Sequence, residues 1–173
     1  MLRGLVIALA VVVGVIAYVA TSGGDDEPAT TQEVAEAEIV SEEQLADAAS
    51  TAETPIYWAG EIDDTQLELT EEEGNFLVRY LQADDEVGAA RAQRIAIGSY
   101  ALSNPRKALN TFAETPGATV TQVEGVGKVV ISPETQKNVY FVDPDNEVQV
   151  EVYAPSSKEA LDLVRSGKVQ PVG

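Results

Sequence analysis

Carboxylates are the side chains of this chain that could do chemistry. Residues 143–147, Asp-Pro-Asp-Asn-Glu, crowd together oxygen ligands of the kind that calcium prefers, and Asp63 with Asp64 form a second acidic pair. The longer stretch lacks the glycine and the twelfth-position glutamate of an EF-hand loop. Asp, Pro and Asn are also ordinary residues of tight turns. We therefore predict turns at both places and no metal site.

Two missing residue types narrow the chemistry further. The 173 residues include no histidine and no cysteine, which excludes histidine-based triads and zinc sites with nitrogen or sulfur ligands. Paired carboxylates could still cleave a glycosidic bond, but no pair stands out among the 29 acidic residues. We predict no catalytic residue, no metal and no cofactor. A carboxylate-dependent hydrolase acting on cell-envelope glycans is the alternative function.

The charge distribution is strongly uneven. The net charge is −18, and residues 21–78 contain 17 acidic residues and no basic one. Such a chain is repelled by phosphates, so nucleic acid is excluded as a partner. The densest basic group is Arg91, Arg94, Arg106 and Lys107. It could bind an anion at a helix start, but we expect it to balance the acidic surface.

The N-terminal apolar run, residues 4–20, contains no charged or amide side chain. As a helix it would be about 26 Å long, close to a bilayer's hydrocarbon thickness of about 30 Å. We expect residues 1–22 to be a transmembrane anchor in the lipid bilayer. A cleaved signal peptide is the alternative, because Ala20-Thr21-Ser22 could be its cleavage site. Arg3 precedes the run and the next basic residue is Arg79, so the N-terminus should be cytoplasmic and the rest outside.

Residues 23–54 are expected to be a disordered acidic linker. They are rich in Ala, Glu, Asp and Thr and contain no aromatic residue, so they cannot bury enough apolar surface to order themselves. Residues 41–50 contain a Ser-x-x-Gln capping box and could form a short helix. A helix of that length is not stable unless another element packs on it.

The folded domain is expected over residues 55–173, where short alternating runs are separated by turn residues. One helix should begin after Asn104, and a second should begin at a Ser-x-x-Glu capping box over residues 156–159. The class is α+β, with a largely antiparallel sheet of about eight short strands covered by two helices on one face. The predicted strands are residues 56–59, 66–71, 75–82, 94–100, 119–123, 128–131, 138–142 and 147–153.

Two stretches of the domain are alike. YWAGEIDDTQLEL at residues 57–69 returns as YFVDPDNEVQVEV at residues 140–152, and Tyr-Ala stands before each predicted helix. A duplication would give two pseudo-symmetric β-rich halves, each backed by a helix. The alternative is that any hairpin with one wet face has this pattern, with Glu68 and Glu151 pointing outward and Val or Leu inward.

The region from Thr54 to Gly173 contains TPIYWAG near its start, LELT followed by VRYL, the IGSY strand, and QVEVYAPS with a terminal PVG. With these motifs it resembles a group of small membrane-anchored envelope proteins of actinobacteria. It implies location and fold only, since the group has no assigned activity. We therefore expect a membrane-anchored extracytoplasmic domain that binds a protein or envelope partner without catalysis.

Overall fold

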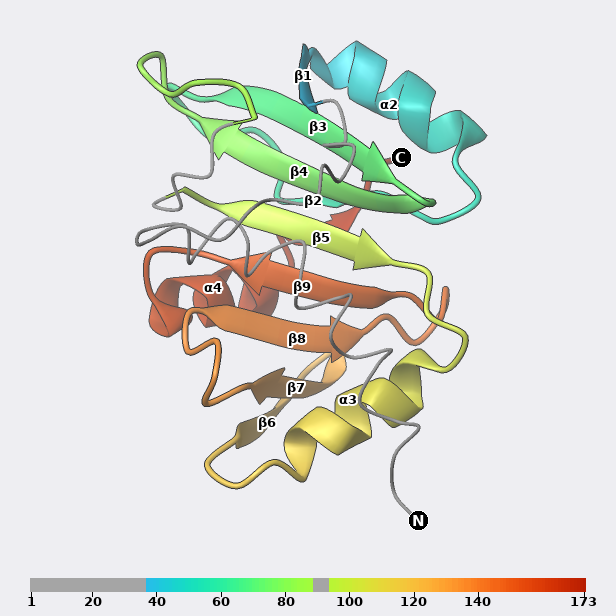
Figure 1. Ribbon diagram of the computed structural model, residues 1–173, viewed down its shortest axis with the longest axis vertical. Helices are drawn as coiled ribbons and strands as arrows, with labels where there is room; N and C mark the ends of the chain where they lie inside the picture. The colour runs from blue at the N-terminus through green and yellow to red at the C-terminus, as the bar shows by residue number, and fades with distance from the viewer. Residues whose placement is uncertain (1–36, 89–93) are drawn as a thin grey trace, which may run out of the picture.

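The computed structural model describes residues 37–88 and 94–173, which build one large antiparallel sheet (Figure 1). Its eight strands stand in the order β1-β3-β4-β5-β9-β8-β7-β6. The α+β class and the large antiparallel sheet predicted from the sequence are confirmed. The strands are β1 Ala37–Val40, β3 Gln66–Glu72, β4 Asn75–Leu81, β5 Ala96–Tyr100, β6 Thr119–Val123, β7 Gly127–Ile131, β8 Asn138–Val142 and β9 Gln149–Tyr153.

The first strand and helix lie where the sequence predicts a disordered linker. β1 pairs with β3 at the edge of the sheet, and helix α2, Glu42–Thr51, follows with the predicted capping box at Ser41. Leu45 of α2 is fully buried in the core. The prediction for residues 23–54 is therefore wrong for residues 37–54, because the sheet supplies the packing partner that a short helix needs.

The longest described hairpin joins β3 and β4 over seven residue pairs. Its two-residue turn is Glu73-Gly74, and both residues have positive φ, as a type I′ turn requires. Alternate side chains of both strands point to opposite faces of the sheet. On its other side, β3 pairs with β1.

Residues 57–69 do not form the predicted hairpin. The short strand β2, Tyr57–Trp58, pairs instead with β10, Gln170–Pro171, in a separate two-stranded sheet. The Val172 amide extends this pairing by donating to the Ile56 carbonyl oxygen at 2.8 Å. The prediction is wrong because β4 offers β3 a seven-residue partner, whereas β2 has only two residues in a strand.

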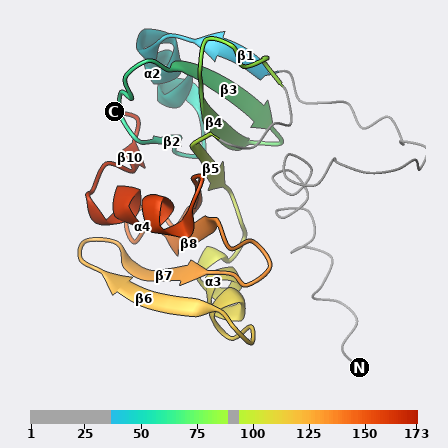
Figure 2. The same ribbon diagram turned by 90° about the vertical axis from the view of Figure 1, so that its left-hand side faces the viewer.

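The helices cover both faces of the sheet. We call the face that carries Val139 and Phe141 the first face, and the face that carries Tyr140 and Val142 the second face. Helices α2 and α4, Ser157–Arg165, pack on the first face, and α3, Pro105–Ala113, packs on the second. Figure 2 shows α2 and α4 on one side and α3 on the other. The prediction of two helices on one face is wrong.

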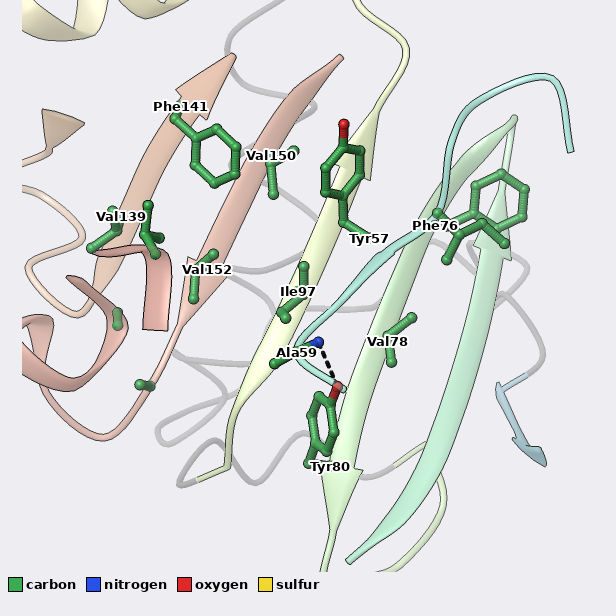
Figure 3. Close-up of a cluster of buried hydrophobic side chains, with 14 of the residues drawn as sticks. Tyr57, Ala59, Phe76, Val78, Tyr80, Ile97, Val139, Phe141, Val150 and Val152 are labelled. Atoms are coloured by element: carbon green, nitrogen blue, oxygen red, sulfur yellow. Dashed lines mark hydrogen bonds between the residues drawn. The ribbon is translucent and has the colours of Figure 1, made fainter. Parts of the chain in front are cut away.

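The main hydrophobic core lies on the first face (Figure 3). Tyr57 reaches across from β2 and meets Phe141 edge to face, with ring centroids 6.5 Å apart. The Tyr80 hydroxyl accepts a hydrogen bond from the Ala59 amide at 2.7 Å. Burial raises the pKa of Tyr80 to about 12. The labelled side chains of the cluster are Tyr57, Ala59, Phe76, Val78, Tyr80, Ile97, Val139, Phe141, Val150 and Val152.

The strand order divides the sheet into four strands from each half of the domain. β5 and β9 pair at the middle, with Gly98 opposite Glu151. Tyr100 and Tyr153 each end their strand and lead toward a helix. The two helices lie on opposite faces, so any likeness of the halves is confined to the strands. The 57–69 and 140–152 stretches occupy unrelated places.

The predicted anchor lies outside the described residues. Residues 1–36, which include the apolar run 4–20 and the first part of the predicted linker, belong to the part of the chain left undescribed. Across residues 37–88 and 94–173 no helix combines the length and the apolarity needed to cross a bilayer.

Candidate functional site

The second face of the sheet carries a buried layer of polar side chains. Glu68 and Gln149 are fully buried and Glu151 is 2 % exposed. The sequence pattern places both glutamates outward in solvent, and this prediction is wrong. Helix α3 covers the second face near β7, β8 and β9, the part of the sheet that carries Glu151. Glu68 lies on β3, away from α3, and its carboxylate contacts Arg79 and the Gly88 amide. The signal for the burial of Glu151 was already present in the apolar stripe of α3, which needs a sheet face to pack on.

Glu151 is the centre of this polar layer. Its Oε2 accepts a hydrogen bond from the Tyr100 hydroxyl at 3.1 Å, and its Oε1 accepts one from the Asn138 side-chain amide. Tyr100 reaches the carboxyl group by lying across Gly98. A Cβ atom at position 98 would come within 2.5 Å of the Tyr100 hydroxyl oxygen. Glycine is thus the residue that leaves space for this hydrogen bond.

Burial raises the pKa of Glu151 above its ordinary value of 4.5, and hydrogen bonds from Asn138, Tyr140 and Tyr100 offset part of the rise. Burial also raises the pKa of Tyr100, and the neighbouring Glu151 charge adds to the effect. The enclosed site therefore favours neutral side chains. Such a carboxyl group can hold a proton at a pH where exposed glutamates are ionised.

Substituting Glu151 with glutamine is expected to remove one component of the pH dependence of stability. Because the folded-state pKa is raised, the contribution of Glu151 is complete below about pH 4.5 and is lost as the pH rises to the folded-state pKa. The unfolding free energy of the wild type minus that of Glu151→Gln should therefore decrease as the pH rises above 4.5. Urea denaturation from pH 4 to 8 measures this, and a constant difference would contradict it.

The Gln149 side chain finds no hydrogen-bond partner among the described residues. Its Nε2 and Oε1 atoms are both buried, and neither makes a hydrogen bond within the described part of the chain. Gln149 lies between Tyr100 of β5 and Val142 of β8 in the strand register. Buried amides are nearly always paired in folded proteins. No sequence signal identifies this residue, since the alternation alone cannot distinguish a buried glutamine from an exposed one.

A buried ion pair lies farther along the second face. Arg79 of β4 donates from Nε to Glu68 Oε1 at 2.5 Å, and the two residues are directly opposite each other in the strand register. The Gly88 amide donates to Glu68 Oε2 at 2.8 Å. The side chains are 8 % and 0 % exposed. The pair holds the segment after β4 against the edge of the sheet.

Comparison with known proteins adds nothing to this geometry. No protein-family model, curated protein or solved structure matches the chain. Function must therefore follow from the described residues themselves.

The acidic stretch at residues 143–147 is a turn. Asp143 Oδ1 accepts hydrogen bonds from the Asp145 and Asn146 amides, both at 2.8 Å, which closes an Asx turn between β8 and β9. Glu147 has positive φ, as Asp64 does in the other acidic pair. No three acidic residues gather to hold a metal ion anywhere in the two described ranges.

The basic residues do not come together. Arg94 pairs with Asp85 before β5, with 2.6 Å between Nε and Oδ2, and this guanidinium lowers the pKa of Asp85. Arg106 follows β5 in the sequence and pairs with Glu147. Arg94 and Arg106 therefore stand on either side of β5 along the chain. Lys107 lies in the first turn of α3, and Arg91 lies outside the described residues. The arrangement fits the prediction that these charges balance acidic neighbours.

The two buried carboxyl groups, Glu68 and Glu151, do not form a glycosidase-like pair. β3 and β9, which carry Glu68 and Glu151, are three strand spacings apart, or about 14 Å at about 4.8 Å each. Glycosidase carboxyl groups lie roughly 5 to 10 Å apart. Glu42 and Glu61 do touch, and partial desolvation and the hydrogen bond with Glu61 raise the pKa of Glu42. Both side chains are exposed.

The two edge strands of the sheet differ in character. β6 carries no charged residue, and Thr119, Val120 and Gln122 are exposed, Val120 by 45 %. β1, the other edge, carries the exposed Glu38. We call the outer side of Thr119–Val123 the β6 edge. Figure 2 shows it at the end of the sheet with β7 as its neighbour on one side. An uncharged edge is a template for pairing with another strand, and charges are the usual protection.

Proposed function

We propose that this chain is a non-catalytic binding or structural domain held outside the cell membrane by its N-terminal apolar segment. It binds a partner polypeptide by adding an extended strand at the β6 edge. The observation that carries the proposal is that the β6 edge is uncharged and exposed at one end of an eight-stranded sheet. Main-chain hydrogen bonds would supply affinity, and the side chains of alternate residues would supply specificity.

The buried polar layer supports binding rather than catalysis. A catalytic carboxylate must reach the proton or carbon that it acts on. Glu151 and Glu68 are instead enclosed, and each makes hydrogen bonds to neighbouring side chains or amides. These contacts serve to hold β3, β4, β5, β8 and β9 in register. Of the two edge strands of the sheet, β6 is the one that carries no charged residue.

The membrane location rests on the apolar run at residues 4–20 and on the absence of basic residues between Arg3 and Arg79. The resemblance to actinobacterial envelope proteins favours the same location. Sequencing the N-terminus of the mature protein tests the anchor. A mature N-terminus at or before Arg3 is expected, and one that begins near Gly23 would show that the segment is cleaved.

Strand addition is tested with a peptide probe. A seven-residue peptide of alternating Thr and Val is added in millimolar excess to the full chain in detergent micelles, and amide hydrogen exchange is followed by NMR. Slower exchange is expected at amides within Thr119–Val123, because those that point outward gain a hydrogen-bond partner. The control is the same peptide N-methylated at every residue, which cannot donate. The proposal fails if β6 amides do not respond or if β1 amides respond equally.

A further inference from the structure

The β6 edge is complementary to itself. We infer that the strand added there is β6 of a second copy of this chain, related by a two-fold axis at Thr121; this rests on the function proposed above. An antiparallel pair centred at Thr121 places Thr121 opposite its counterpart, Val120 opposite Gln122, and Thr119 opposite Val123. A threonine pair across antiparallel strands is favourable, and the other two pairs join a valine to an uncharged polar residue. The contact is isologous and closes on itself.

The two-fold pairing keeps each face of the sheet continuous. Thr119, Thr121 and Val123 share one face of β6 with the first-face residues of β7, because Thr121 is opposite Val129. Val120 lies on the second face opposite Val130. In the symmetric pair, first-face residues meet first-face residues, so two eight-stranded sheets become one sheet of sixteen strands. No side chain has to change sides, as it would after a one-residue slip.

The lack of charged residues favours the β6 edge over other surfaces for contact between copies. The chain has a net charge of −18, so most surfaces would bring like charges together when two copies meet. The β6 edge has no charged residue to place opposite its counterpart. A pair formed through β1 would bring the exposed Glu38 close to its counterpart. Like charges across strands destabilise the pair.

The expected contact buries little surface, so the two copies should pair more readily when both are held in the same membrane. A five-residue strand edge buries less than the roughly 1,200 Å² of a standard stable interface, so free domains should associate weakly. Two copies held in one bilayer meet at effective concentrations on the order of millimolar. We therefore expect pairing by the full chain in vesicles at protein levels where the same chain, diluted in detergent, is monomeric.

Single cysteines test the pairing, because the chain has none of its own. The full chain carrying Thr121→Cys is incorporated into phosphatidylcholine vesicles and exposed to a mild oxidant. Directly opposed residues in an antiparallel pair have Cα atoms about 4.5 to 5.5 Å apart, which suits a disulfide. Disulfide-linked dimers are expected, at least tenfold faster than for Gln122→Cys. That residue is opposite Val120, and its two copies are too far apart to bond.

Further variants separate the outcomes. Ile39→Cys on β1 should crosslink slowly, although Ile39 is 41 % exposed, close to the 45 % of Val120 on β6. If Thr121→Cys does not fold, chains carrying Val120→Cys and Gln122→Cys are mixed, and crosslinks between the two are expected. Equal rates for all single variants indicate random collision and overturn the inference. If no variant crosslinks but the peptide still binds at β6, the inference that the partner is a second copy is wrong and strand addition stands. If there is neither crosslinking nor peptide binding, the proposed strand addition is wrong as well.

Discussion

Substituting Gly98 with alanine is expected to lower the free energy of unfolding by about 2 to 4 kcal/mol, a sum of overpacking and a lost buried hydrogen bond. The added Cβ atom would lie 2.5 to 2.7 Å from the Tyr100 ring and hydroxyl. Neighbouring backbone of β4 and β9 fixes Gly98 on both sides, so the ring has to move. The Glu151 carboxyl group then loses its hydrogen bond from Tyr100.

Urea denaturation of Gly98→Ala and of Tyr100→Phe measures this. The phenylalanine variant loses only the hydroxyl group and should lose about 1 to 2 kcal/mol, less than the alanine variant. The double variant should lose no more than Gly98→Ala alone, because the bond can be lost only once. Wild-type stability in Gly98→Ala would show that the Tyr100 ring does not depend on the absence of a side chain at position 98.

Replacing Arg79 with methionine should destabilise the domain by about 3 to 5 kcal/mol, because it leaves the Glu68 carboxylate buried without its cation. The Gly88 amide still donates to this carboxylate but cannot neutralise its charge. Glu68→Leu combined with Arg79→Met should recover most of the loss, since an apolar pair of similar volume needs no compensation.

A double-mutant cycle in urea measures the coupling between the two side chains. The matched control is Arg94→Met with its partner Asp85, an ion pair that is partly exposed. That control should cost about 1 kcal/mol or less. If Arg79→Met costs no more than Arg94→Met, the buried pair has no special role in stability.

The sequence predicts the strands of this fold better than it predicts their partners. Seven of the eight strands of the large sheet correspond to predicted runs, because side-chain alternation is local. Pairing is not local. Residues 57–69 have the pattern of a hairpin, yet Tyr57 pairs with Pro171. Likewise, β1 and α2 are too polar to be predicted from composition and become ordered only through contacts with β3 and the core.

The buried polar layer could not be predicted, because glutamates that alternate with apolar residues can lie either on a solvent-exposed face or on a buried face of a sheet. Glu68 and Glu151 alternate with apolar residues as solvent-facing residues do. Whether that face is wet at Glu151 depends on α3, which packs on the second face, opposite α4. At Glu68 it depends on Arg79 and on the Gly88 amide. Asn138 and Tyr100 become neighbours of Glu151 only when β5, β8 and β9 are assembled. The uncharged edge at β6, in contrast, is visible in the sequence once its position at the end of the sheet is known.

The pairing of β2 with β10 has a consequence for how the domain folds. Trp58 and Gln170 are partners although more than one hundred positions separate them. Contacts of such long range make loop closure costly and folding slow. The hydrogen bonds between β2 and β10 can therefore form only after residue 170 has been made, whereas the Tyr57 and Ala59 amides bond to Ser99 and Tyr80 without it. The two-stranded sheet is therefore expected to form late in folding, after the strands of the large sheet have paired.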